Sequence, residues 1–293
     1  MTLEQLRIFV AVAELQHVTR AAEQLHLTQS SVSSAISTIE GRHQVKLFNR
    51  VGRRIELTAE GAHFLASARS VLAEMRSAEA ILDDLSQVRR GTLSIFASQT
   101  IASFWLPPLL VGYLAKFPNI ELKVSIGNTA ESASAVCDGH AELGFIEGEI
   151  DLPAVHMCDV AQDKLVVVVG RDHHWAKAPP QTLAELPQTA WALREPGSGT
   201  RSSFEGALQA KGVDARELKV VLELPSNEAL CTAVGVSDLA TAVSVSAACA
   251  GIESGRLVAL PLDIGQRAYR LIRHKERRLS RSAQAFLNIL PAG

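Results

Sequence analysis

The chain has 293 residues, a length that suits about two domains and excludes a peptide or a disulfide-stabilised miniprotein. Its 29 Lys and Arg residues nearly balance 31 Asp and Glu residues, so the net charge of −2 by itself indicates neither a nucleic-acid-binding nor a membrane-binding protein. The four cysteines form no Cys-x-x-Cys pair and have no histidine partner at zinc-site spacing, so no metal site is expected.

The amino terminus does not resemble an export signal. Its longest apolar run, Ile8 to Ala13, is flanked by Glu4 and Glu14, and is too short and too acidic for a signal peptide. The uncharged segment 91–115 has the length of a membrane span, but its Ser, Thr and Gln side chains would be left unpaired in lipid. We therefore expect a cytoplasmic protein that does not associate with a membrane.

Helix-breaking residues divide the chain into two parts. All 11 prolines lie at or beyond Pro107, and the glycines before residue 91 are Gly41, Gly52 and Gly61, which predicts a helical first part. Beyond residue 91, β-branched runs alternate with alanine-rich helical segments, a pattern typical of an α/β domain with a mostly parallel sheet. The predicted strands are Leu93 to Ala97, Ile120 to Ile126, Leu143 to Ile146, Leu165 to Val169, Trp191 to Arg194 and Val220 to Leu224. The fold class predicted for the whole chain is α + α/β.

The first sixty residues have the pattern of a helix-turn-helix. A helical stripe (Leu3, Leu6, Phe9, Val10, Ala13) is followed by a short helix at Thr19 to Leu25 and by a third helix that Thr28 can cap. The third helix buries Val32, Ala35, Ile36 and Ile39. Its opposite face carries Ser30, Ser33, Ser34 and Ser37, with Gln29 in the first turn. Small polar groups on such a face suit contact with DNA, although a merely solvated helix would look the same.

A basic segment follows this helix. Arg42, Lys46, Arg50, Arg53 and Arg54 lie between Gly41 and Ile55, with no acidic residue among them. The Val51-Gly52 pair can turn a two-stranded ribbon that places the last three arginines near its tip. A winged helix-turn-helix uses such a tip on the phosphate backbone or in the minor groove.

Residues 59–90 are predicted to form one long helix. Apolar residues recur at spacings of four and three, as in a coiled coil, at Phe64, Ala68, Val71, Met75, Ala78, Leu82 and Leu85. We expect this helix to dimerise, because no other apolar partner is evident nearby. The alternative is an amphipathic helix packed on its own domain.

These residues resemble the LysR-type transcriptional regulators. The resemblance rests on T-R-A-A-E-Q-L-H-L-T-Q-S-S-V-S from Thr19 to Ser33, followed by I-E at Ile39-Glu40, L-F-N-R at Leu47 to Arg50 and L-T at Leu57-Thr58. It implies a winged helix-turn-helix at 1–58, a dimerisation helix at 59–90 and an effector-binding domain at 91–293. That last domain would have two lobes of the type 2 periplasmic-binding-protein kind, 91–161 plus 266–293 and 162–265.

The resemblance also assigns the DNA contacts. The recognition helix runs from Gln29 through Ile39, with Gln29, Ser30, Ser33, Ser34 and Ser37 as DNA-binding residues and Arg50, Arg53 and Arg54 as wing contacts. His43 and Gln44 depart from the Leu-Gly that the family usually has there, which leaves the entry into the wing in question.

In the second part, polar residues follow strand ends, where helix amino termini present free N–H groups to anions. Glu147 also follows a strand and could meet an amine, although a surface-loop glutamate is the more ordinary interpretation. We predict no bound cofactor other than a small effector, which would be anionic or amino-acid-like. Within the family, the run A-S-Q-T-I-A together with G-N-T most resembles the regulators of sulfur and cysteine assimilation. The predicted effector-binding residues are Ser98, Gln99, Thr100, Asn128, Thr129, Glu147, Ser198, Gly199, Thr200, Arg201 and Asn227.

The leading hypothesis is a regulator that binds promoter DNA as a homodimer or homotetramer, responds to an effector and can contact RNA polymerase. One alternative is a solute-binding protein, against which the helix-turn-helix argues. Another is an enzyme that uses a thiol or a histidine, for which Cys158, His156, His173 and His174 are the candidates. No G-x-S-x-G or H-E-x-x-H motif supports an enzyme.

Overall fold

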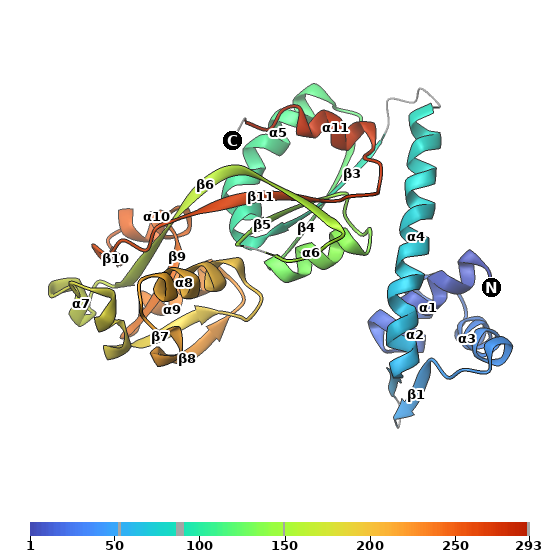
Figure 1. Ribbon diagram of the computed structural model, residues 1–293, viewed down its shortest axis with the longest axis horizontal. Helices are drawn as coiled ribbons and strands as arrows, with labels where there is room; N and C mark the ends of the chain where they lie inside the picture. Colours follow the sequence, from blue (N-terminus) through green and yellow to red (C-terminus); the bar gives the residue numbers. More distant parts are fainter. Residues whose placement is uncertain (52–53, 86–90, 149, 292–293) are drawn as a thin grey trace. The chain divides into compact units, whose positions relative to one another are not determined.

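The computed structural model describes residues 1–51, 54–85, 91–148 and 150–291. The chain forms two compact units, one of Met1–Ser86 with Asp138–His140 and one of Gln87–Cys137 with Ala141–Gly293. Figure 1 labels their helices and strands, and each unit is described by itself.

The first unit begins with the three predicted helices, α1 (Leu3–Leu15), α2 (Val18–Gln24) and α3 (Gln29–His43). The predicted cap of α3 is confirmed, since Thr28 Oγ1 accepts a hydrogen bond from Ser31 N at 3.2 Å. The helices share a core around Phe9, whose ring lies 5.5 Å from that of Phe48. Leu3, predicted to lie on the buried stripe, is 44% exposed.

The predicted wing ribbon is confirmed. Strands β1 (Phe48–Val51) and β2 (Arg54–Leu57) pair antiparallel. The Glu40 carboxylate joins α3 to this ribbon: it accepts hydrogen bonds from Leu47 N at 2.8 Å and Phe48 N at 3.2 Å, and Lys46 Nζ lies 2.8 Å away. Burial by itself raises the pKa of Glu40, but these bonds outweigh it and hold the pKa below its ordinary value of 4.5.

The long helix is confirmed as α4 (Ala59–Leu85), but the expectation that it lacks an apolar partner nearby is wrong. Its first half packs on α1: the Phe64 ring lies 4.8 Å from that of Phe9, and Ala68 and Leu72 are buried in the same core. The heptad pattern of α4 shows which face is apolar but cannot show that this face packs on α1, because α1 is distant in sequence. Val71, a residue of the same seam, is 47% exposed.

The second unit holds one nine-stranded sheet in the order β4-β3-β5-β11-β6-β9-β7-β8, with β10 paired to β6. Its strands are β3 (Thr92–Ser98), β4 (Glu121–Gly127), β5 (Leu143–Glu147), β6 (Val155–Gly170), β7 (Ala190–Arg194), β8 (Lys219–Leu224), β9 (Leu239–Ser244), β10 (Leu257–Ala259) and β11 (Gln266–His274). Its helices are η1 (Ile101–Trp105), α5 (Leu106–Lys116), α6 (Thr129–Cys137), α7 (His174–Lys177), η2 (Leu183–Gln188), α8 (Gly199–Ala210), η3 (Ala215–Glu217), α9 (Asn227–Val234), α10 (Val245–Glu253) and α11 (Arg281–Leu287).

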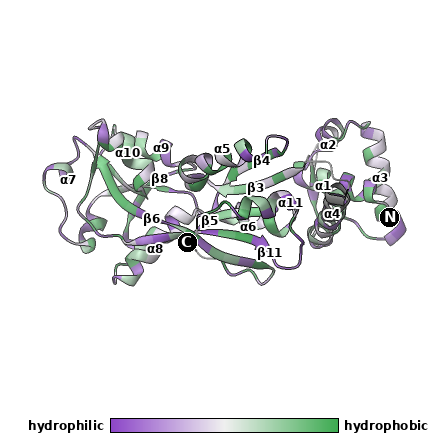
Figure 2. Ribbon diagram, turned by 90° about the horizontal axis from the view of Figure 1, so that it is seen from above, coloured by the Kyte–Doolittle hydropathy of each residue, from purple (hydrophilic) through white to green (hydrophobic). Residues whose placement is uncertain are grey.

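The sheet is mixed, not mostly parallel as predicted. Strands β4, β3 and β5 are parallel to one another, as are β8, β7 and β9, but β6 and β11 run antiparallel to each other and to the strands they border. These two long strands connect the lobes (Figure 1). The predicted strand Leu165 to Val169 is the hydrophobic second half of β6, coloured green in Figure 2.

Each lobe has its own aromatic core. In the first lobe the rings of Trp105 and Phe145 lie 5.7 Å apart, and in the second those of Trp191 and Phe204 lie 5.3 Å apart. Burial raises the pKa of Tyr113 to about 12, and its hydroxyl donates to Ser282 O at 2.8 Å. Within the described ranges, no helix combines the length and the apolarity that a membrane crossing requires.

Replacing Gln44 with glycine is expected to stabilise the first unit by about 1 kcal/mol, because Gln44 ends α3 with φ of +51°, a left-handed conformation that costs an L-residue about that much. The measurement is urea unfolding followed by far-UV circular dichroism. Tryptophan fluorescence would not detect unfolding of the first unit, because Trp105, Trp175 and Trp191 all lie in the second unit. Gln44→Ala is the control and keeps the strain. Equal midpoints for the two variants would refute this explanation.

Glu40→Gln is expected to lower the free energy of unfolding of the first unit by about 1 kcal/mol at pH 7. The reason is that the hydrogen bonds from Leu47 N and Phe48 N would then be accepted by a neutral amide in place of a charged carboxylate. The pKa of Glu40 is lower in the folded chain than in the unfolded chain. The ionised carboxylate therefore contributes its full stabilisation above a pH of about 4.5, and this stabilisation is lost as the pH falls through the folded-state pKa. The difference between the variants should therefore shrink in acid. Glu23→Gln, on an exposed carboxylate of α2, serves as control, and a pH-independent difference would contradict the assignment.

Candidate functional site

The polar face predicted on α3 is present. Gln29, Ser30, Ser34 and Ser37 are exposed, and Ser33 is half-buried. An open groove beside this face is lined by Ser30, Ser31, Ser34, Ala35, Thr38 and Gln5 of α1. Gln5 was not among the predicted residues. Its side chain closes the α1 capping box with Thr2, and a polar residue at that cap position was the available signal.

The predicted wing contacts are described only in part. Arg50 and Arg54 belong to the strands β1 and β2, and Arg53 lies outside the described residues. Their contact with DNA therefore stays a prediction from the sequence.

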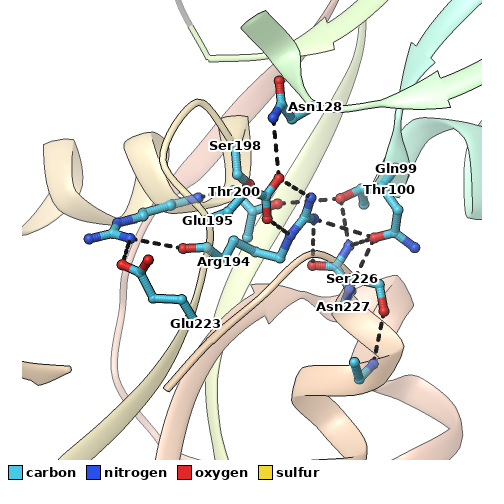
Figure 3. A network of polar contacts seen from close by, with 12 residues as sticks. Gln99, Thr100, Asn128, Arg194, Glu195, Ser198, Thr200, Glu223, Ser226 and Asn227 are labelled. Atoms are coloured by element: carbon cyan, nitrogen blue, oxygen red, sulfur yellow. Dashed lines mark hydrogen bonds and ion pairs between the residues drawn. The ribbon is translucent and has the colours of Figure 1, made fainter. Parts of the chain in front are cut away.

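The second unit brings most of the predicted effector residues together at the junction of its lobes (Figure 3). We call the following residues the interlobe network: Gln99, Thr100 and Asn128 from the first lobe, and Arg194, Glu195, Thr200 and Asn227 from the second. Each lies at or just after the carboxyl end of a strand or in the first turn of a helix, because both lobes turn those ends toward each other. Ser198 and Ser226 cap the helices α8 and α9 through Arg201 N and Ala229 N.

Gln99 has the most contacts across the junction. Its Oε1 accepts from Asn227 N at 3.1 Å, from Asn227 Nδ2 and from Arg194 Nη1 at 3.4 Å. Its Nε2 donates to Glu228 Oε2 at 2.6 Å. Thus one amide side chain of the first lobe bonds to three residues of the second.

A second chain of bonds passes through the threonines. Thr100 Oγ1 accepts from Asn227 Nδ2 at 2.9 Å and lies 3.3 Å from Thr200 Oγ1. Thr200 Oγ1 in turn accepts from Arg267 Nη1 at 3.0 Å, and Arg267 Nε donates to Asp163 Oδ2 at 2.8 Å. The pair on β11 and β6 is thereby connected to both lobes.

Glu147 is buried, not on a surface loop. The residue is 1% exposed at the end of β5, and its Oε1 lies 3.8 Å from Arg267 Nη2. Among the described residues, neither Glu147 Oε1 nor Ser98 Oγ, which is equally buried, has a hydrogen-bond partner. Two buried polar atoms of the first lobe thus have hydrogen-bonding capacity that the described chain does not use.

Gly199 of the second lobe lies close to Thr129 and Glu147 of the first lobe. A Cβ on Gly199 would lie 2.4 Å from Glu147 O and 2.5 Å from Thr129 Oγ1, so glycine is required for this contact. Thr129 Oγ1 itself donates to Glu147 O at 2.8 Å. Both residues therefore set the spacing of the lobes.

Arg201 does not join the interlobe network. Its guanidinium is held within the second lobe by Glu205 at 2.8 Å, by Glu223 and by Arg194 O at 3.0 Å. Burial by itself lowers the pKa of Arg201, but the two carboxylates outweigh this and raise it. The effector residues predicted from the sequence do not include Arg194, Glu195, Asp163 or Arg267. The first two directly precede Pro196 and the predicted residues from Ser198 onward, but no local pattern distinguishes the other two.

Of the residues considered for an enzyme, His173 has a structural role and Cys158 has an unfavourable pKa. His173 caps α7 by accepting from Trp175 N at 3.0 Å, and its other ring nitrogen lies 3.1 Å from Thr189 Oγ1. Burial raises the pKa of the Cys158 thiol, the opposite of what a nucleophilic thiol needs. Within the part of the chain that the structure describes, no group of His, Cys, Asp or Glu is arranged to hold a metal.

Known proteins match both units. Residues 3–62 match the family model "Bacterial regulatory helix-turn-helix protein, lysR family", and residues 86–293 match "LysR substrate binding domain". Over 292 residues the chain is 32% identical to YeiE of Escherichia coli (strain K12), described as an uncharacterized HTH-type transcriptional regulator, covering 98% of this chain and 96% of that one.

Two solved structures share the fold. Full-length CbnR complexed with its target DNA has a TM-score of 0.68 and 22% identity, with 98% of each chain covered. The regulatory domain of Synechocystis PCC6803 CcmR, in complex with 2-PG, has a TM-score of 0.61 and 24% identity, covering 68% of this chain and 95% of that one. Together with the family matches, these findings place the chain in the LysR family of transcriptional regulators, with a helix-turn-helix DNA-binding domain followed by an effector-binding domain.

Proposed function

We propose that this regulator binds DNA through the exposed polar face of α3 and a small effector between the lobes of its second unit. Residues 1–58 would form the DNA-binding domain, 59–90 the dimerisation helix and 91–293 the effector domain. It would act in the cytoplasm and catalyse no reaction. The observation that carries the effector site is the interlobe network, in which polar groups from both lobes converge near two buried atoms that have no hydrogen-bond partner among the described residues.

On α3, short side chains let the backbone of the helix approach DNA closely. Ser30 and Ser34 border the groove next to α1, so base-edge contacts would come from this side. The arginines of the wing would bind phosphates, which position the helix without reading sequence. Gln5 lines the same groove and would add a phosphate contact from α1.

An effector would replace bonds that the lobes now make to each other. Ser98, Thr100, Thr129, Thr200 and Asn227 offer hydroxyl and amide groups, and Glu147 offers a buried carboxylate. An amino-acid-like molecule satisfies both kinds of group, because its carboxylate accepts from the amides while its ammonium group donates to Glu147. A purely anionic molecule would satisfy the amide and hydroxyl donors alone. The regulatory domain of CcmR, which shares this fold, forms a complex with the small molecule 2-PG.

Such a ligand can regulate only if it binds two arrangements of the lobes with different affinity. The interlobe network spans both lobes, and Thr200 connects it to the strands β6 and β11 through Arg267, so a bound ligand would change the spacing of the lobes. Assembly into a homodimer or homotetramer would transmit that change to DNA or to RNA polymerase. Val71 and Ala78 of α4 are exposed and available to a second copy.

Arg53→Ala is expected to weaken binding to all DNA sequences alike and to lower the slope of log affinity against log salt by about one unit, because one phosphate contact releases about one counterion. Filter or fluorescence titrations at several salt concentrations would measure it. Arg216→Ala removes the same charge from an exposed site in the second unit and should leave the slope unchanged. An unaltered slope for Arg53→Ala would remove the wing from the interface.

Thr100→Ala is expected to abolish the thermal stabilisation by an effector found among small anions, amino acids and sulfur metabolites. A ligand at about 100 times its dissociation constant stabilises the folded protein by about 2.7 kcal/mol, which is readily seen in a thermal shift of the full-length chain. Thr232→Ala, on the exposed side of α9, is the matched control. An effector whose shift survives Thr100→Ala would bind elsewhere.

A further inference from the structure

The oxygen of the Gln99 side chain occupies a position with three donors. Asn227 contributes its main-chain N–H and its Nδ2, and Arg194 contributes Nη1. The amide is held in this orientation, because its nitrogen donates to Glu228 and lies 3.3 Å from Ser103 Oγ. Figure 3 shows Gln99 directed at Asn227 and Arg194 across the junction.

The donors are built into the second lobe, whereas Gln99 is not fully buried. Asn227 is 0% exposed and opens the eight-residue helix α9, where free N–H groups carry partial positive charge. Arg194 is 3% exposed and is held by a bidentate pair with Glu195, at 2.8 and 3.0 Å. A neutral carbonyl uses such donors weakly, since hydrogen bonds to a charged oxygen are about twice as strong.

Two carboxylates, those of Glu195 and Glu228, lie near Gln99 and could repel a bound anion. Glu195 is neutralised by its pair with Arg194, and Glu228 is exposed to solvent, where its charge is screened. The groups that face Gln99 Oε1 are therefore N–H donors: those of Asn227 at the positive end of α9 and Nη1 of Arg194.

We propose that this position is the carboxylate subsite of the effector site, and that Gln99 fills it as an internal substitute for the ligand. The inference rests on the proposed function and adds to it the ligand chemistry and a regulatory role. Without effector, Gln99 joins the lobes. A ligand carboxylate displaces its amide oxygen, takes the three donors and frees the first-lobe segment that carries Gln99.

The test uses acetate as probe and the full-length protein, at constant ionic strength with chloride as balancing anion. Gln99→Ala removes the internal competitor and is expected to lower the apparent dissociation constant for acetate about tenfold, because the binding-competent fraction rises. Gln99→Asn, too short to reach the donors, should behave in the same way. Gln99→Glu supplies its own carboxylate and should show no saturable response.

The double variant Gln99→Ala/Asn227→Ala should not show the tighter acetate binding of Gln99→Ala, since it lacks the Nδ2 donor of the subsite. An acetate affinity equal to that of the unmodified chain in both Gln99→Ala and Gln99→Asn would overturn the proposal, as would a gain that persists in the double variant. If a panel effector binds in a Thr100-dependent manner while the Gln99 variants leave acetate binding unchanged, the subsite assignment fails and the effector site stands.

Discussion

The ion pair between Arg267 and Asp163 is the interaction on which the second unit depends most. The two residues are register partners on β11 and β6, at the point where these strands pass from one lobe to the other, and both are less than a tenth exposed. Asp163 also accepts from Ser244 at 2.8 Å, and Arg267 donates to Thr200. A buried pair contributes little net stability, but removal of one partner leaves an unpaired charge in the interior. The pair therefore specifies where the lobes meet.

Glu147 gives this cluster an excess of negative charge. One guanidinium lies between two carboxylates, Asp163 at 2.7 Å and Glu147 at 3.8 Å, so the second is poorly compensated. Burial and the Asp163 charge raise the pKa of Tyr269, whose ring lies 6.0 Å from the Arg267 guanidinium. An ammonium group from a ligand would restore balance at Glu147, while a carboxylate would suit the donors around Gln99. The two ends of the junction thus differ in the charge that they favour.

In the first unit, Glu40 has a comparable role. Its carboxylate is bonded to main-chain N–H groups at the start of the wing, so α3 and the ribbon are connected by one side chain. Thr58 adds a second connection, since its hydroxyl donates to Lys46 O at 2.7 Å while accepting from Gly61 N. Gly61 is needed at the start of α4, because a Cβ there would lie 2.1 Å from Leu47 O. The strained Gln44 lies between these connections, where the chain leaves α3.

The sequence by itself determined the local structure: the cap at Thr28, the serine face of α3, the ribbon that begins at Phe48, and the strand ends at Arg194 and, within one residue, at Ala97. These depend on capping, periodicity and turn residues, which act over a few positions. The tertiary structure alone decided the antiparallel course of β6, the packing of Phe64 on α1 and the burial of Glu147. It also paired Arg267 with Asp163 across 104 positions. Such contacts arise when separate elements share a core, and no short pattern encodes which residues will meet there.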